Sequence, residues 1–176
     1  MKEIPLTQGK VASVDDGNFE WIAENKWRAK NTAWGFYAIR DLPHTKDGRP
    51  RKQLRMHVVI WEHHYGIPVP EGYTVDHIDR NPLNNQIDNL RLATSAQQQH
   101  NQGPRKTNTS GYKGVSLDKR CQKYRVRITD IDGEEIFLGY FEDRVEAARA
   151  YDMTAIRYYG EFAVLNFPLA LPTERV

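Results

Sequence analysis

A short strand that ends in Asp76-His77 constrains this chain more than any other feature of its 176 residues. Tyr73-Thr74-Val75 has the aromatic and β-branched composition of a strand, and the Asn-rich segment 78–88 then returns the chain to Asn89-Leu90-Arg91. A carboxylate can hold a divalent metal against a phosphate, and a neighbouring imidazole can take a proton from water. The strand and the returning segment therefore predict a site that hydrolyses a phosphodiester.

Composition places the chain among globular proteins and excludes several classes. Hydrophobic residues make up 39% of the chain and aromatic residues 11%, which suits one domain or two small ones. No apolar run approaches a membrane span, and the first residues lack the apolar core of a signal peptide, so we expect a cytoplasmic protein without membrane contact. Because Cys121 is the only cysteine, an internal disulfide and a cysteine-rich zinc site are excluded.

Charge is segregated along the chain although the net charge is only +2. Residues 105–129 carry eight Lys or Arg against one acid, and residues 130–152 carry eight acids against two arginines. A second basic block lies at 46–55. A basic surface that faces phosphates, with acidic residues on the opposite side, explains this pattern. The alternative is solvent-exposed charge with no binding role.

Three regions follow from the patterns of strands, helices and turns. Residues 1–55 are predicted to be β-rich with one short helix and have no assigned chemistry; a hairpin turn is expected at 47–50. The four large aromatic residues expected in the core of this region are Trp21, Trp27, Trp34 and Phe36.

The second region, 56–102, is predicted to contain a helix over 57–65 ended by Gly66, the strand to His77, a strand over 89–93 and a helix from Ser95. Residues 103–110 have linker composition. The third region, 111–168, shows three strands over 114–117, 123–130 and 135–140, then a helix that Asp143 and Glu146 cap and Gly160 ends; residues 169–176 form a tail.

Two family resemblances become specific at these residues. The segment Val75-Asp76-His77-Ile78-Asp79-Arg80-Asn81-Pro82, with Asn89-Leu90-Arg91-Leu92-Ala93-Thr94, resembles an HNH endonuclease of the phage or homing type. Gly111-Tyr112-Lys113-Gly114-Val115, Leu138-Gly139-Tyr140-Phe141, Ala147-Ala148-Arg149-Ala150-Tyr151-Asp152 and Leu165-Asn166-Phe167-Pro168 resemble an AP2 DNA-binding domain. The resemblances imply an α+β protein: a ββα-metal nuclease core behind the β-rich N-terminal region, tethered to an AP2-like domain of a three-stranded sheet and a helix.

The HNH resemblance implies a role for each matching residue. His77 matches the general base, Asp76 a metal ligand, and Asn89 an amide that braces the loop orienting the histidine. The ion implied is Mg²⁺ or Mn²⁺. The further ligand position is Gln98, where the family has His or Asn. Three outcomes stay open: Gln98 coordinates after adjustment, His100 replaces it, or the metal is bound weakly.

Alternation in the third region predicts which side chains face DNA. Tyr124, Val126 and Ile128 should pack on the helix stripe Ala148, Tyr151 and Ala155, leaving the opposite face of the strand basic. The residues expected to bind duplex DNA are Lys113, Lys119, Arg120, Lys123, Arg125 and Arg127. Phe137 stands where plant AP2 domains carry a DNA-contacting Trp, and Glu135 is an acid on the same face, so the plant target sequence does not transfer.

The favoured interpretation is a metal-dependent HNH endonuclease, a monomer or weak dimer, positioned on double-stranded DNA by its AP2-like domain. The main alternative is a non-catalytic DNA-binding regulator whose nuclease site has decayed at Gln98, and an RNA-binding or interaction module is a third. His57, His63 and His64 are expected to serve helix packing or helix surface. A supporting role for His57 at the active site stays open.

Overall fold

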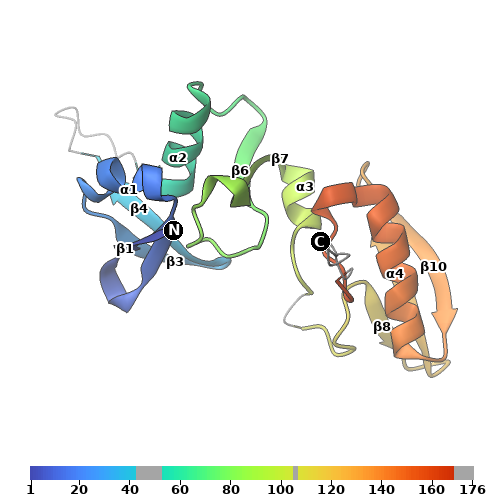
Figure 1. Cartoon of the computed structure of the whole chain (residues 1–176). Helices are drawn as coiled ribbons and strands as arrows, with labels where there is room; N and C mark the ends of the chain where they lie inside the picture. Colours follow the sequence, from blue (N-terminus) through green and yellow to red (C-terminus); the bar gives the residue numbers. More distant parts are fainter. Residues whose placement is uncertain (43–52, 105–106, 169–176) are drawn as a thin grey trace, which may run out of the picture. The chain divides into compact units, whose positions relative to one another are not determined.

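The structure is a computed structural model that describes residues 1–42, 53–104 and 107–168. The chain forms two compact units, Met1–Ser95 and Ala96–Val176 (Figure 1). The turn predicted at 47–50, the basic residues at 46–52 and 105–106, and the tail 169–176 lie outside the described residues. The domain limits predicted from the sequence stay predictions.

The described part of the first unit is built from small antiparallel sheets and two helices. Its elements are β1 Lys2–Pro5, β2 Val11–Val14, α1 Asp16–Ala23, β3 Arg28–Thr32, β4 Gly35–Asp41, β5 Gln53–Arg55, α2 Met56–Tyr65, β6 Tyr73–His77 and β7 Leu90–Thr94. Strand β1 pairs with β2, β6 pairs with β7, and the third sheet has the order β3-β4-β5. The helix predicted over 57–65, the strand that ends at His77 and the strand predicted over 89–93 are confirmed within one residue.

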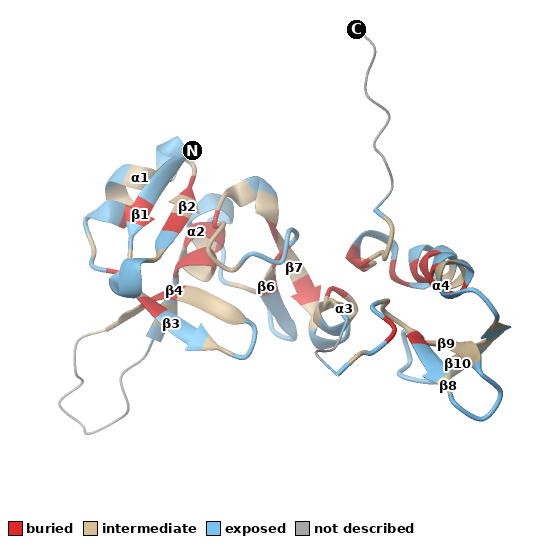
Figure 2. Ribbon diagram, turned by 90° about the horizontal axis from the view of Figure 1, so that it is seen from below, coloured by how far each residue is buried: buried red, intermediate tan, exposed pale blue. Residues whose placement is uncertain are grey.

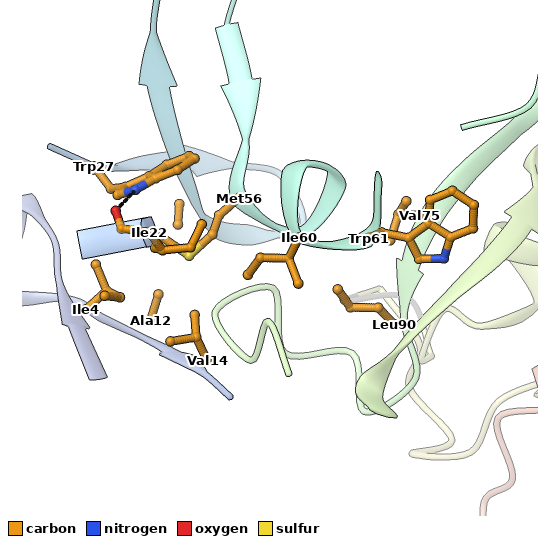
Figure 3. Packing of buried hydrophobic residues seen from close by; sticks show 11 residues of the cluster. Ile4, Ala12, Val14, Ile22, Trp27, Met56, Ile60, Trp61, Val75 and Leu90 are labelled. Atoms are coloured by element: carbon orange, nitrogen blue, oxygen red, sulfur yellow. Dashed lines mark hydrogen bonds between the residues drawn. The ribbon is translucent and has the colours of Figure 1, made fainter. Parts of the chain in front are cut away.

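One hydrophobic cluster joins the N-terminal strands to the strand that carries His77. Ile4 and Val14 pack with Met56, Val75 and Leu90 in this cluster, which Figure 3 shows from close by. A buried hydrogen bond from an indole nitrogen, Trp27 Nε1, to the carbonyl oxygen of Ile22 (3.0 Å) fixes the end of α1 against it. Residues on both sides of position 55 therefore share a core.

Helix α2 starts directly from β5 and ends as predicted. Gly66 takes the left-handed conformation (φ 68°), and its N–H donates to the carbonyl of Glu62 at 2.9 Å, a frequent glycine C-cap. Met56, one residue before the helix predicted over 57–65, is the first residue of α2 and is fully buried. Burial of this apolar side chain decides where the strand ends.

The loop between β6 and β7 is held against the N-terminal elements. The N–H of Ser13 donates to the carbonyl of Leu83, and the N–H of Asn85 donates to the carbonyl of Ser13, each at 2.8 Å. Asp15 Oδ2 accepts from the N–H of Ile87 at 2.7 Å. These bonds give the loop a fixed shape beside His77.

One aromatic residue departs from expectation. Trp34 was predicted in the core with the other large aromatics, but it is 63% exposed at the turn between β3 and β4, whereas Trp27 is buried as predicted. Local composition alone did not distinguish a turn position from a strand position.

The second unit contains α3 Ser95–His100, which begins at the boundary, and the elements β8 Val115–Asp118, β9 Lys123–Thr129, β10 Glu135–Phe141 and α4 Arg144–Tyr159. The sheet order is β10-β9-β8, and Figure 1 shows α4 lying along this sheet. The side chain of Asp143 caps α4 by accepting from the N–H groups of Val145 and Glu146, as predicted.

The packing face predicted from alternation is confirmed in this unit. Val126 and Ile128 are buried on β9, whereas Tyr124, the third residue predicted on this face, is only partly buried. Ala148, Tyr151 and Ala155 are buried on α4, where Figure 2 shows buried segments in red. Gly114 makes this close approach possible. A Cβ added at Gly114 would lie 1.9 Å from Tyr151 Cδ2, and its φ is +76°.

Two contacts attach α3 within the second unit. The ring of His100 stacks on Tyr159 with centroids 3.8 Å apart. Lys113 Nζ donates to the carbonyl oxygens of His100 and Gln102, each at 2.6 Å. These carbonyls lie at the C-terminal end of the helix, where a cation is favourable. No helix in the described part of the chain has the length and apolarity needed to cross a membrane.

Candidate active site and nucleic-acid face

His77 lies at the end of β6 in a cluster of rings. It is 4% exposed, and its ring centroid is 4.7 Å from that of His57 and 6.1 Å from that of Tyr37. His57 comes from the first turn of α2 and Tyr37 from the middle of β4. Packing of α2 on the sheet thus places three rings together from distant parts of the sequence.

An asparagine of the loop fixes the orientation of His77. His77 Nε2 lies 3.4 Å from Oδ1 of Asn85, a long hydrogen bond, and Asn85 is fully buried with its amide donating to the carbonyl of Leu83. Because an amide oxygen only accepts, this contact favours the tautomer with the proton on Nε2. Burial lowers the pKa of His77 below its ordinary value, while the hydrogen bond with Asn85 and the charges of Asp79 and Asp76 oppose that shift. The imidazole is therefore neutral at cellular pH.

Asp76 points to the other face of the strand and meets an arginine. Residues Asp76 and Arg91 are paired across β6 and β7, and Arg91 donates to Asp76 Oδ2 from Nε and from a terminal nitrogen, each at 3.4 Å. Their side chains are only 15% and 10% exposed. These distances are long for hydrogen bonds, so the contact is weak. The Asp76 carboxylate is also of the ligand type that Mg²⁺ and Mn²⁺ accept.

Asn89 ties the two ends of the loop together. Its Oδ1 accepts from the N–H of Asp79 at 2.9 Å, and its Nδ2 donates to Asp79 Oδ1 at 2.9 Å and to the carbonyl of Asn84 at 2.8 Å. Burial raises the pKa of Asp79, but hydrogen bonds from Asn84, Asn81 and Asn89 outweigh it and hold that pKa below its usual range. An ionised Asp79 thus forms the centre of the loop network.

Gln98 lies on α3 in the second unit and is partly buried. His100, the alternative ligand, is engaged with Tyr159 by ring stacking. Burial, then the charge of Lys113, lowers the pKa of His100. No group of three or more His, Cys, Asp or Glu side chains with metal-binding geometry occurs among residues 1–42, 53–104 and 107–168. Asp76 offers a carboxylate oxygen and Gln98 an amide oxygen, and both are ligand types that Mg²⁺ accepts, since that ion takes few protein ligands and keeps waters and substrate phosphates.

Three basic residues share one face of β9, the central strand of the second unit's sheet. Lys123, Arg125 and Arg127 alternate with the buried residues of β9, and Lys119 and Arg120 are exposed in the turn that precedes this strand. The ammonium of the sixth predicted residue, Lys113, is bonded to the end of α3.

Acids and aromatic rings modify this basic face. Arg127 forms an ion pair with Glu135, and Lys123 forms one with Glu142 at 3.2 Å. Phe137 and Tyr140 are 53% and 47% exposed. Their rings lie edge to face, with centroids 5.2 Å apart. Exposed aromatics beside cations suit contact with bases and sugars as well as phosphates.

Sequence reasoning did not assign chemistry to Asn85, Asp79, Tyr37 or Arg55. The Asn-rich composition of the loop was a signal for Asn85 and Asp79, since their roles depend on local hydrogen bonds. Tyr37 and Arg55 reach the site through packing of β4 and β5, and their local sequence carried no such signal.

Comparisons with known proteins agree with this geometry. A family profile described as HNH endonuclease matches residues 55–100. Protein 3.8 of Escherichia phage T7 is 38% identical over 112 residues, which is 64% of this chain and 90% of the phage protein. An uncharacterized HNH endonuclease of Acanthamoeba polyphaga mimivirus is 29% identical over 151 residues, or 85% of this chain and 75% of that protein.

A plant protein also matches part of the chain. APETALA2-like protein 2 of Oryza sativa subsp. indica is 47% identical over 60 residues, which span 34% of this chain and 14% of the rice protein. The chain belongs to the HNH endonuclease family, and part of it is homologous to AP2-like proteins. The family recognised from the motifs is thereby confirmed. HNH endonucleases are typically metal-dependent, and both homologies imply DNA binding.

Proposed function

We propose that the chain is a metal-dependent endonuclease of the phage or homing type that hydrolyses phosphodiester bonds in duplex DNA. The observation that carries this proposal is the buried His77, whose ring lies against His57 and whose Nε2 contacts Asn85. A neutral imidazole with a fixed tautomer is the arrangement that a general base requires. The phage relative supports action inside a bacterial host.

The proposed reaction begins with proton removal from a water molecule. With the proton of His77 on Nε2, Nδ1 is the basic nitrogen that takes the water proton as the water oxygen attacks phosphorus. The bond from phosphorus to the 3′ oxygen breaks, and this oxygen takes a proton from solvent. The products are a 5′-phosphate and a 3′-hydroxyl, as the family resemblance implies.

Asp76 and Gln98 are the residues proposed to hold the metal, and the ββα arrangement of β6, β7 and α3 is the proposed frame. When bound, Mg²⁺ or Mn²⁺ would neutralise charge on the phosphate and on the leaving oxygen. Arg91 restrains the Asp76 carboxylate through long contacts, and Asn89 keeps the loop closed around Asp79. Both residues position groups and do not themselves exchange protons.

The AP2-like unit is proposed to place the protein on duplex DNA, as a monomer or weak dimer. Lys119, Arg120, Lys123, Arg125 and Arg127 would contact phosphates or base edges from the sheet face. Lys113 is proposed to contribute its charge from the edge of this face while it bonds the end of α3. A single HNH site makes one nick, so a double-strand break needs a second event.

The test is nicking of supercoiled plasmid by the full chain with Mg²⁺, Mn²⁺ or EDTA, beside a gel shift on the same DNA. Metal-dependent nicking supports the endonuclease. DNA binding without nicking under any metal would contradict it and favour a non-catalytic regulator. One observation favours that second candidate: the proposed metal ligand Asp76 is paired with Arg91. A regulator should also bind Mn²⁺ no better than its Asp76→Ala variant.

A further inference from the structure

Arg55 is an exposed cation at the edge of the candidate active site. It is the last residue of β5 and immediately precedes α2, and its guanidinium lies over the ring of Tyr37, 6.0 Å from the centroid. Among the described residues, no acid forms an ion pair with Arg55. On the same sheet Arg28, by contrast, is paired with Asp41 at 2.9 Å.

Tyr37 connects this arginine to the catalytic histidine. Its ring centroid is 5.6 Å from that of His57 and 6.1 Å from that of His77. Burial raises the pKa of Tyr37, the charge of Arg55 opposes that shift, and the charge of Asp76 adds to it. Tyr37 thus contacts Arg55 as well as the rings of His57 and His77.

A second, independent feature of this ring cluster is not explained by packing. His57 is 2% exposed and belongs to the ring cluster, yet its Nδ1 has no hydrogen-bond partner among the described residues. Buried polar atoms in proteins almost always have a partner, so the exceptions need a reason beyond stability. The exception here lies directly against the candidate general base.

We propose that Arg55, held over Tyr37, binds a backbone phosphate of the DNA next to the bond attacked at His77. This inference rests on the proposed function. A guanidinium presents paired N–H donors that match two phosphate oxygens, and stacking on a ring leaves its donor edge available. Such a contact would place the scissile phosphate and add positive charge where negative charge develops.

The experiment uses the full chain and two matched variants, Arg55→Gln and Arg28→Gln. Each variant removes one positive charge from the same sheet. The affinity for a duplex oligonucleotide is measured against salt concentration, and plasmid nicking is followed with Mn²⁺. We expect Arg55→Gln to lower the magnitude of the slope of log affinity against log salt by about 1, the loss of one phosphate contact. Nicking should slow by about 10- to 100-fold.

Arg28→Gln should leave the salt slope unchanged, because Asp41 already neutralises that charge. The difference in salt slope between wild type and Arg55→Gln tests the phosphate contact. Nicking by the wild type tests the proposed function. If wild type and Arg55→Gln share one slope, the phosphate contact is wrong, whether or not either protein nicks. If the slope falls in Arg55→Gln alone, the contact is supported even for a chain that does not cut. Arg55 is exposed, so thermal unfolding of its variant should match the wild type.

Discussion

Burial of His77 favours the neutral protonation state that its proposed function requires. Water exclusion lowers the pKa of the imidazole, and a neutral imidazole is the form that accepts a proton. Orientation has a separate source, the buried amide of Asn85. The Asn85 side chain is itself held by the backbone of the loop, through the carbonyl of Leu83.

Asn85→Ala should therefore slow nicking more than it weakens DNA binding. Loss of a group that orients a catalytic or metal-bound side chain costs about 10- to 100-fold in activity. Nicking rate and gel-shift affinity should be measured on the same preparation. Asn81→Ala is the control in the same loop, because its side chain accepts from the N–H of Leu83 and not from His77. Equal losses in the two variants would indicate that loop shape, rather than orientation of His77, is what Asn85 supplies.

His57 makes the stability of the first unit depend on pH. Burial, then the charges of His77 and Arg55, holds the pKa of His57 well below its ordinary value. The unfolded chain binds a proton near pH ~6.5, whereas the folded chain does not. Stability is thus fully present above that pH and falls as pH drops below it, by up to about 1.4 kcal/mol per pH unit.

Urea unfolding followed by tryptophan fluorescence at pH 7.5 and 5.5 (about one unit either side of the unfolded pKa) measures this effect. All four tryptophans belong to residues 1–95, so the signal reports the first unit. In His57→Gln the loss of stability between the two pH values should be smaller. An identical loss in the variant would assign the pH dependence to another group.

At the scale of elements, Gly114 sets how closely α4 approaches the sheet. A methyl group at this position would overlap the ring of Tyr151, and a positive φ adds strain for any side chain. Gly114→Ala should lower the free energy of unfolding of the second unit by roughly 2–4 kcal/mol. Amide hydrogen exchange in β9 and α4 measures it.

Gly111→Ala is the matched control for that substitution. Gly111 also has a positive φ (+82°), but an added Cβ would meet nothing within 4 Å. Gly111→Ala should lower the free energy of unfolding by about 1 kcal/mol, from backbone strain alone. Similar protection losses in both variants would mean that the close approach to Tyr151 contributes little.

The ion pair between Arg127 and Glu135 predicts an unusual effect on DNA affinity. Glu135 lies on the proposed DNA face and neutralises one of its cations. Glu135→Gln should therefore tighten binding, by about threefold at low salt, while Arg125→Gln should weaken it about tenfold. Fluorescence anisotropy with a labelled duplex measures both. Weaker binding by Glu135→Gln would mean that the pair orders Arg127 for contact.

Strands and helices were predictable because their signals are local. Alternation on β9, the glycine after α2 and the cap at Asp143 each depend on residues within one element. Asp76, His77 and Asn89 could be nominated for the same reason, since they flank one loop. Tyr37, His57 and Arg55 could not be assembled from sequence, because their proximity depends on how α2 packs on β4. The exposed Trp34 shows the same limit, since composition alone predicted it in the core.

On the scale of the whole molecule, catalysis and DNA binding are proposed for different parts of the chain. The first unit carries His77 in a loop that N-terminal strands hold in shape, and the second carries a basic sheet face backed by α4. The HNH family profile covers residues 55–100, which include His77. Chemistry and DNA affinity should therefore respond to different substitutions.

The most direct measurement is nicking by His77→Ala compared with the wild type, at equal occupancy of the same DNA with Mg²⁺ or Mn²⁺. We expect the nicking rate to fall by at least about 10²-fold, since a general base contributes about 10²–10⁴-fold, and the DNA affinity to change less than about twofold. Nicking by His77→Ala at the wild-type rate would show that another group activates the water, and the assignment of the active site to β6 would be wrong.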